Sequence, residues 1–214
     1  MSKSSNYYGS FYFESFQKSI GEFGGKANLF KFSDYLHKDI TILDFGCGGG
    51  FLLNQISAYK KIGVEINKFA REHCKSLGID CYEFIDEIED ESVDLIISNH
   101  CLEHTENPYY LVGKLFNKLK RGGRLVVVLP WDRNVKFKER DINNHFYSFS
   151  PLNIGNIFQS HGFINIQSKK LLHKWPPGFH IIQNLFGWKL FHYFCYIYGF
   201  FRRNWVQVHC VGEK

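Results

Sequence analysis

The sequence predicts an α/β fold built on a doubly wound, mostly parallel seven-stranded sheet with an antiparallel edge strand. Short apolar runs alternate with helix-like segments through most of the chain. The last two strand-like segments instead show partial alternation of apolar and polar residues, which favours an antiparallel edge. At 214 residues the chain is long enough for one sizeable core, so we expect a single domain.

The layout of this domain follows from changes in composition along the chain. Residues 1–39 are aromatic and punctuated by glycine, and form an N-terminal cap with a helix expected near 26–36. Residues 40–171 carry the regular strand and helix alternation of the core. An aromatic, helical insertion is expected over 172–204, and a last edge strand over 205–214.

The core opens with a β-α-β unit. ITILDF (40–45) is a short apolar run that ends in glycines, which is typical of a buried parallel strand, and residues 51–59 are expected to form the helix after it. KIGVEI (61–66) is the second strand. The helix after it is expected to be capped by Asn67 and ended by Gly78.

The middle of the core continues this alternation. A third strand is expected near 80–84, and VDLIISN (93–99) is a fourth, apolar enough to be covered on both faces. Asn107 supplies an N-cap and Pro108 a first helical residue, and leucines then recur every four residues. We expect this helix to stop at the glycine pair that begins with Gly122.

The remaining elements complete the sheet. RLVVVLP (124–130) is the fifth strand, and Ser150 with the following proline opens a helix that closes at Gly162. FINIQSKKL (163–171) and WVQVHCV (205–211) are the two strands with partial alternation. An edge hairpin of this kind can join a parallel sheet without breaking the right-handed crossover rule.

Composition and cysteine spacing limit the partners and the compartment. The net charge of +5 comes without a long basic run, so we expect no nucleic-acid partner. Six cysteines stand at no disulfide-scaffold or zinc-like spacing, so we expect no metal site, and free thiols indicate a cytoplasmic protein. The N-terminus shows no secretory signal pattern.

The glycine cluster after the first strand is the sharpest motif. Asp44, Gly46, Gly48 and Gly50 complete the pattern D-x-G-x-G-x-G, whereas the third glycine of the dinucleotide pattern G-x-G-x-x-G falls on Phe51. A nicotinamide enzyme is therefore disfavoured. Glycines let the chain turn tightly and let a ligand approach backbone N–H groups.

At this motif the sequence resembles the class I S-adenosylmethionine-dependent methyltransferases, of the bacterial small-molecule or surface-glycan type. The resemblance covers about residues 40–170 and implies the Rossmann-like methyltransferase fold, with S-adenosylmethionine as cofactor. Glu65 stands 21 residues after Asp44, at the end of the second strand, where a carboxylate can accept both ribose hydroxyls of a bound nucleoside. A plain surface glutamate is the alternative.

The resemblance also implies a set of cofactor-binding residues. Asp44 and the backbone around the glycines are expected to hold the amino-acid end, and an apolar side chain after the third strand is expected to cover the adenine. Glu83, Asp86 and Glu87 compete for the adenine amine, and we favour Asp86 over a merely solvated acidic loop. The expected set is Asp44, Gly46, Cys47, Gly48, Glu65, Ile66, Phe84, Ile85, Asp86, Asn99 and His100.

Two segments supply candidate catalytic residues. The stretch 98–104 ends in Leu-Glu-His, as in many small-molecule methyltransferases of this class, and places His104 after the fourth strand. The segment 143–148 follows the fifth strand and supplies His145 and Tyr147. Any of the three could act as a general base, although a histidine that only packs its loop is an equally good interpretation.

In the Leu-Glu-His stretch and in Phe-Tyr-Ser-Phe-Ser-Pro (146–151) the resemblance is strongest to bacterial methyltransferases of surface-polysaccharide and secondary-metabolite pathways, which implies O-methylation of a sugar or polysaccharide precursor. No Asn-Pro-Pro-Tyr-like tetrapeptide follows the fourth strand, which disfavours amino-group methylation by that route. Two alternatives stay open: a membrane-docked methyltransferase of a lipid or quinone-type acceptor, and a non-catalytic binding module on the same fold.

The aromatic segment 176–203 is too polar to cross a bilayer comfortably, because Gln183, Asn184, Lys189 and His192 interrupt it. We expect it to cover the acceptor pocket, to form a homodimer contact, or to make a peripheral membrane contact, in that order of preference. Its aromatic residues could equally pack on the sheet as extra core.

Overall fold

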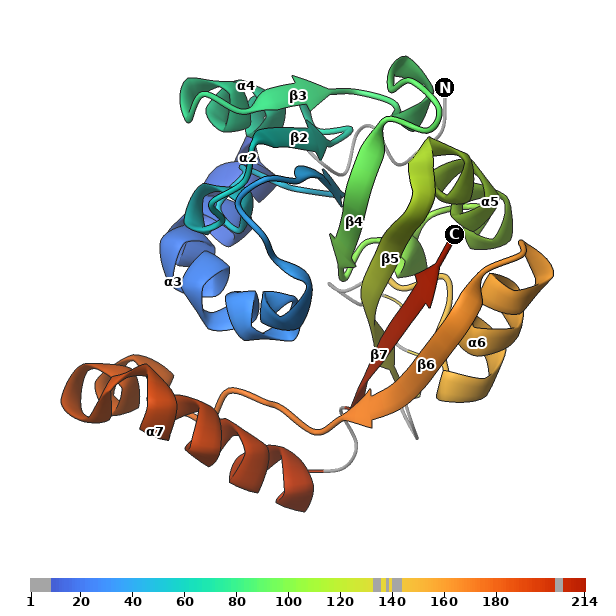
Figure 1. Ribbon diagram of the computed structural model, residues 1–214. Helices are drawn as coiled ribbons and strands as arrows, with labels where there is room; N and C mark the ends of the chain where they lie inside the picture. The colour runs from blue at the N-terminus through green and yellow to red at the C-terminus, as the bar shows by residue number, and fades with distance from the viewer. Residues whose placement is uncertain (1–8, 133–135, 138, 140–143, 203–205) are drawn as a thin grey trace.

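The computed structural model describes residues 9–132, 136–137, 139, 144–202 and 206–214 and holds one seven-stranded sheet of order β3-β2-β1-β4-β5-β7-β6 (Figure 1). Strands β1 to β5 pair in parallel, whereas β7 runs antiparallel to both β5 and β6. The predicted fold class is confirmed, with the antiparallel strand one place in from the edge. The strands are β1 Thr41–Phe45, β2 Lys60–Val64, β3 Asp80–Tyr82, β4 Val93–Asn99, β5 Leu119–Trp131, β6 Ile164–Leu171 and β7 Val206–Glu213.

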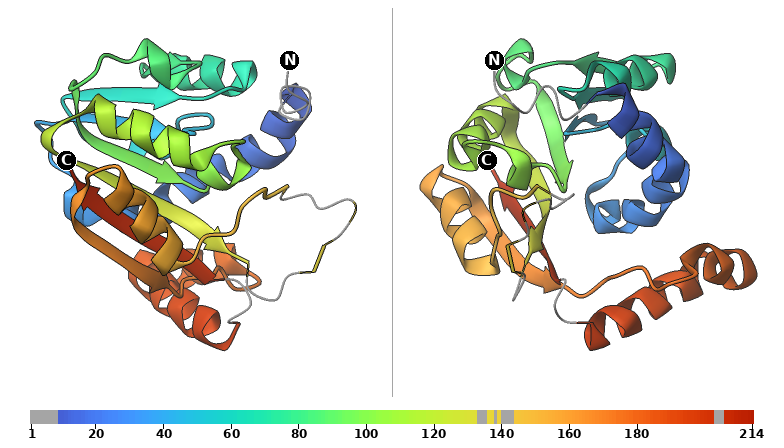
Figure 2. Two further views of the ribbon diagram at one scale, coloured as in Figure 1. Left: turned by 90° about the vertical axis from the view of Figure 1, so that its right-hand side faces the viewer. Right: turned by 180° about the vertical axis from the view of Figure 1, so that it is seen from behind.

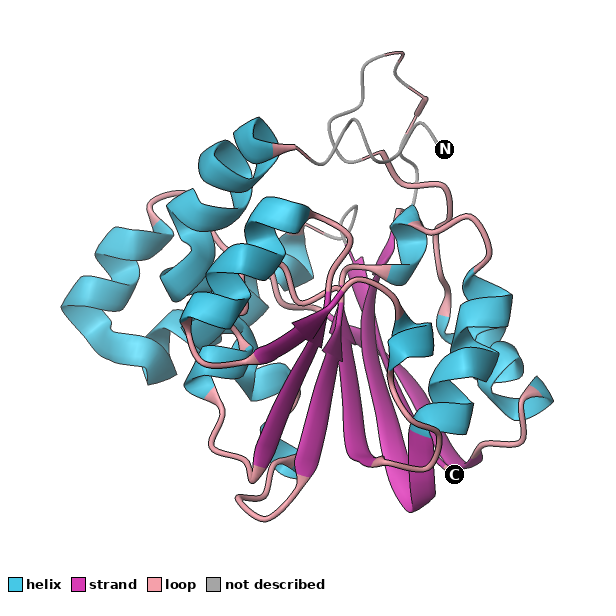
Figure 3. Ribbon diagram, turned by 90° about the horizontal axis from the view of Figure 1, so that it is seen from above, coloured by secondary structure: helices cyan, strands magenta, loops and turns pink. Residues whose placement is uncertain are grey.

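Helices cover both faces of the sheet (Figures 2 and 3). One core lies under α5 and α6 and includes Leu115 and Phe158, and the other lies on the opposite face and includes Phe32, Leu53 and Cys74. Burial on both faces explains why the central stretches of β4 (residues 95–97) and β5 (residues 125–129) are continuously apolar. The helices are α2 Ser10–Tyr12, α3 Ser19–Asn28, α4 Lys68–Ser76, α5 Pro108–Lys118, α6 Pro151–Ser160 and α7 Phe179–Phe201, with a π-helical turn Phe13–Lys18 between α2 and α3.

The predicted helix starts are confirmed by their caps. The Asn67 side chain accepts from the backbone N–H of Phe69, and that of Asn107 accepts from Tyr110, both at 3.0 Å. Ser150 caps α6 in the same way, by accepting from the N–H of Asn153. Each cap satisfies a donor that the first turn of a helix leaves unpaired.

The helix predicted over 51–59 does not form. The segment contains only a short 3-10 turn at Leu53–Gln55, and Ile56 already has extended backbone. Leu52, Leu53 and Ile56 are all buried in the core beside β1. The spacing of these three positions would also suit one face of an α-helix, so the local pattern allows a helix, and contacts with the core beside β1 decide against it.

Two further boundaries differ from the prediction. The helix expected near 26–36 lies earlier, as α3, because Gly25 lets that helix pack where a Cβ would overlap the carbonyl oxygen of Phe51. The helix expected to run to Gly122 ends at Lys118, and β5 begins at the next residue. The glycine pair instead sits at an irregularity in the pairing of β5 with β4.

The insertion between β6 and β7 is helical, as predicted. Its helix α7 is interrupted at Gly187, whose φ of 72° and ψ of 177° separate two helical pieces. No helix among the described residues is long and apolar enough to cross a membrane. Residues 1–8 of the cap, Asn143 and residues 203–205 lie outside the described part of the chain.

Candidate functional site

The glycine turn after β1 is tied to the neighbouring strand. The N–H groups of Gly46 and Cys47 both donate to the carbonyl oxygen of Val64 in β2, at 2.8 and 3.1 Å. Gly46 has a φ of +81°, and a Cβ there would lie 2.5 Å from the Cβ of Cys101. Only glycine fits this position, because both the backbone conformation and the close approach of the loop after β4 exclude a side chain.

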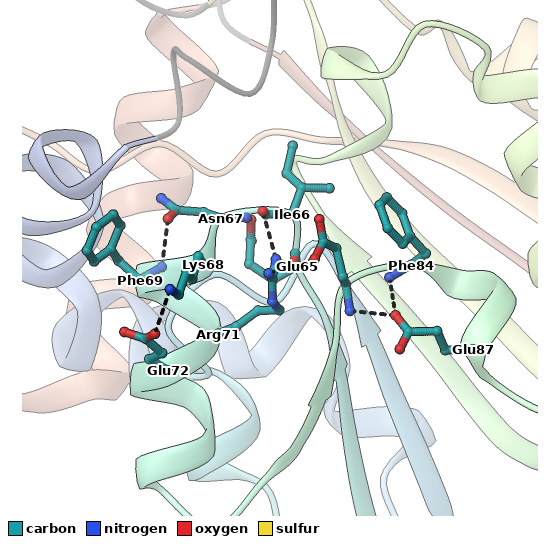
Figure 4. A network of polar contacts seen from close by, with 10 residues as sticks. Glu65, Ile66, Asn67, Lys68, Phe69, Arg71, Glu72, Phe84 and Glu87 are labelled. Carbon is teal, nitrogen blue, oxygen red and sulfur yellow. Dashed lines mark hydrogen bonds and ion pairs between the residues drawn. The ribbon is translucent and has the colours of Figure 1, made fainter. Parts of the chain in front are cut away.

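Glu65 joins this turn to the end of β2. Its Oε2 accepts from the N–H of Gly48 and its Oε1 from the N–H of Asn67, both at 2.9 Å. Arg71 Nη1 donates to the backbone carbonyl of Glu65, which fixes the same corner (Figure 4). Burial raises the pKa of Glu65, while the two backbone donors act in the opposite direction. Each carboxylate oxygen keeps acceptor capacity for a ligand.

A cleft of about 480 Å³ opens at the carboxyl ends of β1 to β4, a size within the usual range of small-molecule sites. Ile66 and Phe84 face it with about half of their surface exposed. Of the predicted site residues, the cleft is lined by Gly46, Glu65, Ile66, Phe84, Ile85, Asp86, His100 and His104.

A second cavity of about 220 Å³ adjoins the cleft and shares Gln17 and Gly46 with it. Two buried oxygens among its lining residues, Asp44 Oδ1 and Gln17 Oε1, have no hydrogen-bond partner within the described residues. Burial, with the Glu65 charge nearby, raises the pKa of Asp44 to about 8. The other predicted residues that line this cavity are Cys47, Gly48 and Asn99.

These two cavities fit the cofactor that the sequence implies. Unpaired buried acceptors are costly, and an ammonium group placed between Asp44 and Gln17 would satisfy both of them. The apolar slot beside Ile66 and Phe84 suits a flat base, and Glu65 stands at the junction of the two cavities. The residues present therefore match a nucleoside that carries an amino-acid end.

The three acidic candidates after β3 have different environments. Glu87 Oε1 accepts from the backbone N–H groups of Glu83 and Phe84, so it closes a turn (Figure 4). Glu83 pairs with Arg71 at 2.8 Å, and Asp86 pairs with Lys114 at 2.6 Å. Only Glu83 and Asp86 line the cleft, so Glu87 has the structural role.

A polar network lies under the end of β4. The Asn99 side chain accepts from Lys31 Nζ at 3.0 Å, and Lys31 also donates to Gln207 Oε1 at 2.7 Å. A ring nitrogen of His100, Nε2, lies 3.1 Å from the same Gln207 oxygen. Burial lowers the pKa of Lys31 to about 7, although the Glu103 charge opposes this shift. The network fixes the side chains of both predicted residues, Asn99 and His100.

Glu103 lies fully buried between two histidines. Its Oε1 is 3.3 Å from His100 Nδ1 and 3.7 Å from His104 Nε2. Burial raises the pKa of Glu103, but the contact with His100 and the charges of both histidines together hold it below its usual value. Burial is also the main cause that lowers the pKa of His104, so its imidazole is neutral at neutral pH.

His145 and Tyr147 stand behind the wall of the cleft. The His145 ring lies 5.0 Å from that of His104, and its Nδ1 is 2.8 Å from Asp132 Oδ2. The Tyr147 hydroxyl donates to the carbonyl of Glu106 and so braces the loop. Neither side chain is among the residues that line the cleft, whereas His104 is.

In the described part of the chain, two groups of side chains are close enough to hold a metal ion. One is Glu103 with His104 and His145, and the other is a set of three buried thiols. Their spacing in the sequence did not predict either group. The thiols belong to Cys47, Cys74 and Cys81, with sulfur distances of 3.9 and 3.7 Å. Since the Cys47 side chain points into this group, only its backbone can serve a ligand in the glycine turn.

Sequence reasoning missed several residues of the site. Gln17 lies in the π-helical turn, and such turns often mark functional positions. Lys31 and Gln207 come from the cap and from β7, far along the chain from β4, and neither stands in a motif. Glu103 lies in the Leu-Glu-His stretch, but the sequence does not show that its side chain is fully buried, and so its role beside the histidines could not be predicted.

The chain matches the family model described as "Methyltransferase domain" over residues 22–168. Among solved structures it is similar to an S-adenosylmethionine-dependent methyltransferase from Archaeoglobus fulgidus, with 18% identity, 95% and 100% of the two chains covered, and a TM-score of 0.67. It is also similar to Haemonchus contortus phosphoethanolamine N-methyltransferase 2, with 15% identity, 94% and 60% covered, and a TM-score of 0.61. These likenesses show the fold.

Among curated proteins, the chain is 31% identical over 103 residues to a ubiquinone biosynthesis O-methyltransferase from Glaesserella parasuis, covering 40% of this chain and 43% of that protein. It is 24% identical over 89 residues to phosphoethanolamine N-methyltransferase 2 from Caenorhabditis elegans, covering 40% and 20%. The matches span less than half the length of either relative.

Proposed function

The chain belongs to the methyltransferase domain family, and from this premise we propose that it is an S-adenosylmethionine-dependent methyltransferase acting on a small-molecule acceptor. The observation that carries the proposal is the pair of adjoining cavities with Glu65 at their junction and two unpartnered buried oxygens in the smaller one. We also propose a cytoplasmic location, which the six free thiols support.

In this proposal the glycine turn and the strand ends bind different parts of the cofactor. Asp44 and Gln17 accept from the ammonium group, and the backbone at Gly46, Cys47 and Gly48 passes beside the amino-acid chain. Glu65 accepts from the ribose hydroxyls, in addition to its two backbone donors. Ile66, Phe84 and Ile85 cover the base, and Asp86 or Glu83 accepts from its amino group.

When bound, S-adenosylmethionine would supply a methyl group on a positively charged sulfur. The acceptor atom would bond to the methyl carbon in line with the sulfur, which leaves as the neutral thioether. The residues of this chain orient the acceptor and the cofactor, exclude water from the reaction centre and remove the acceptor's proton. Asn99 and His100, held by Lys31 and Gln207, form a fixed wall at the end of β4. Little covalent machinery is required for this step.

We assign proton removal from a hydroxyl acceptor to His104. Its ring lines the cleft, and its lowered pKa keeps the imidazole neutral and able to take a proton. The adjacent Glu103 carboxylate then stabilises the imidazolium that forms. His145, paired with Asp132, supports the His104 ring from behind, and Tyr147 holds the loop.

For the acceptor we propose the hydroxyl of a sugar or polysaccharide precursor, because a histidine base suits an oxygen that must lose its proton. A lipid or quinone-type phenol is the second candidate. The match to a ubiquinone biosynthesis O-methyltransferase favours it. Both acceptors present a hydroxyl, so the same base would serve either of them.

Two measurements test the proposal. Calorimetric titration with S-adenosylhomocysteine should show binding, and absence of binding by the folded protein would remove the proposed activity. Turnover of S-adenosylmethionine should then be measured with hydroxylated sugars and with prenylated phenols. Turnover only on phenols would select the second acceptor, and cofactor binding without turnover on either set would favour a binding module.

A further inference from the structure

Helix α7 presents an apolar face that no described part of the chain covers. Ten of its large apolar side chains are exposed, and seven of them retain at least 45% of their accessible surface. These seven are Ile181, Leu185, Phe186, Leu190, Tyr193, Phe200 and Phe201. Ile181 and Leu185 lie four residues apart in the first helical piece. Leu190, Tyr193, the exposed Ile197 and Phe201 follow one another three or four residues apart in the second piece, and so lie in a stripe on one side of the helix.

The opposite face of α7 packs against the rest of the protein. Phe191 and Cys195 are fully buried and form a small core with Ala27 of α3, against which Phe23 and Trp175 also pack. Gly199 completes this face, because a Cβ there would lie 2.7 Å from the carbonyl oxygen of Leu172. The exposed stripe is therefore not required to attach the helix, and a large exposed apolar patch indicates a binding surface.

The charge of this part of the chain is entirely positive. Residues 142–212 contain no aspartate or glutamate and six lysines and arginines. Lys189 is exposed on α7 and Arg202 is exposed directly after it, and the Arg202 guanidinium lies 5.9 Å from the centre of the Tyr198 ring. An apolar and aromatic stripe beside cations, without acidic groups, is the composition of helices that lie in the interface of an anionic bilayer.

Two other roles for the stripe, a contact with a second copy of the chain and a lid over the acceptor pocket, are disfavoured. In a symmetric contact between two copies through α7, Lys189 and Arg202 would face a segment that has no carboxylate to pair with them. A lid would close over the acceptor pocket, yet no residue of α7 lines the cleft or the adjoining cavity. A lipid surface supplies both the apolar layer and the negative charge.

We propose that α7 docks this protein on the surface of an anionic lipid bilayer, with the stripe from Ile181 to Phe201 in the interfacial layer and Lys189 and Arg202 among the headgroups. The helix follows β6, which runs parallel to β4 and β5, so it leaves the sheet at the edge where the cleft opens (Figure 1). Docking would thus hold that edge near the membrane. The inference does not depend on the proposed activity.

Vesicle flotation tests the docking. The full chain should float with phosphatidylcholine vesicles that contain roughly a third phosphatidylglycerol, and less with phosphatidylcholine alone. Leu185→Asp combined with Phe201→Asp should reduce the bound fraction about tenfold or more, because two apolar side chains no longer enter the interface. The matched control is Leu152→Asp on α6, where the leucine is 74% exposed against 70% for Leu185. It should float like the wild type.

A second pair of variants separates charge from apolar burial. Lys189→Gln with Arg202→Gln should abolish the preference for anionic vesicles, and raised salt should do the same to the wild type. Unchanged melting temperatures would show that all variants are folded. Equal flotation of wild type and the Leu185→Asp, Phe201→Asp variant would overturn the proposal. A wild-type dimer that those substitutions disperse, without vesicle binding, would overturn it in favour of a second copy.

Discussion

Glu65 is the central residue of the proposed cofactor site. Its carboxylate already accepts two backbone N–H groups, which fixes its orientation toward the cleft before any ligand arrives. A preorganised acceptor loses little entropy when it binds a hydroxyl pair. The same contacts tie the glycine turn to the start of α4, so this one side chain both holds the turn in place and is available to bind the ribose.

Glu65→Ala should weaken S-adenosylhomocysteine binding by roughly 1.5–3 kcal/mol, about ten- to a hundredfold, because charge-assisted hydrogen bonds to the ribose are lost. Calorimetry measures this directly. Glu72→Ala is the control, since that glutamate is exposed and its ion-pair distance to Lys68 is 3.9 Å. Unchanged affinity in a folded Glu65→Ala protein would exclude the assigned role.

If Asp44 binds the cofactor ammonium as proposed, we expect cofactor binding to depend on pH. With its pKa raised to about 8, the carboxyl is mostly protonated at neutral pH, and a cationic ammonium favours the ionised form. Affinity for S-adenosylmethionine should therefore rise between about pH 6 and 7.5, by up to roughly tenfold per unit, while the ligand amine stays largely protonated. Asp44→Asn should bind more weakly and show a flat profile. Parallel profiles for the two proteins would place the ammonium elsewhere.

His104→Ala should lower kcat about 10²-fold or more and leave cofactor affinity unchanged, as expected for a general base. The wild-type rate should fall only below the usual pH range of histidine, because burial lowers the pKa of His104. Steady-state kinetics across pH supplies the measurement, with His37→Ala, an exposed histidine, as control. A near-normal rate for His104→Ala, or a rate abolished by a chelator, would reject the base.

At the scale of single elements, the turn after β1 depends on glycine for two separable reasons. Gly46 and Gly178 both have positive φ, of +81° and +71°, but only Gly46 has atoms where a Cβ would lie. Gly178→Ala should thus cost only the backbone strain, roughly 1–2 kcal/mol, whereas Gly46→Ala should cost about 1–3 kcal/mol more through overlap with Cys101. Urea unfolding measures both. Equal losses would mean that the loop around Cys101 yields without cost.

The elements that could be predicted from the sequence are those fixed by local signals. The segment VDLIISN coincides with the strand Val93–Asn99 residue for residue, since its short apolar run is a local signal that lies between polar groups. The helix expected over 51–59 failed because Leu52, Leu53 and Ile56 are buried by contacts that a local pattern does not contain. Tertiary burial outweighs helix propensity in so short a segment.

The site divides in the same way. Glu65 and the glycines could be predicted because strand ends and turn chemistry are local properties. Gln17 and Lys31 could not, because each reaches its partner across the fold, Lys31 over 68 positions to Asn99. Polar side chains from the cap thus complete a site whose frame is the sheet.

At the scale of the whole molecule, the sheet with its two helical layers and the helix α7 are separable in function. Both cavities are lined by the sheet ends, the cap and the loops, the larger one also by α5, and α7 contributes no residue to either one. Its connections to the rest include the small core of Phe191 and Cys195 against α3 and the ring contacts of His192 and Tyr196 with Phe30 of the cap. Cofactor binding and membrane docking should therefore respond independently to changes in the chain.

Replacing 176–203 by a short glycine-serine linker should leave S-adenosylhomocysteine affinity within a few fold of wild type, because the cavities keep all their lining residues. Flotation with anionic vesicles should be lost, since the whole exposed stripe is removed. Phe23 would be uncovered by the deletion, so Phe23→Ser in the deleted protein serves to keep it monodisperse. Calorimetry and flotation on the same preparation decide the outcome. If cofactor affinity disappeared while the sheet remained folded, α7 would be part of the binding site after all, and if flotation persisted, another surface would hold the membrane.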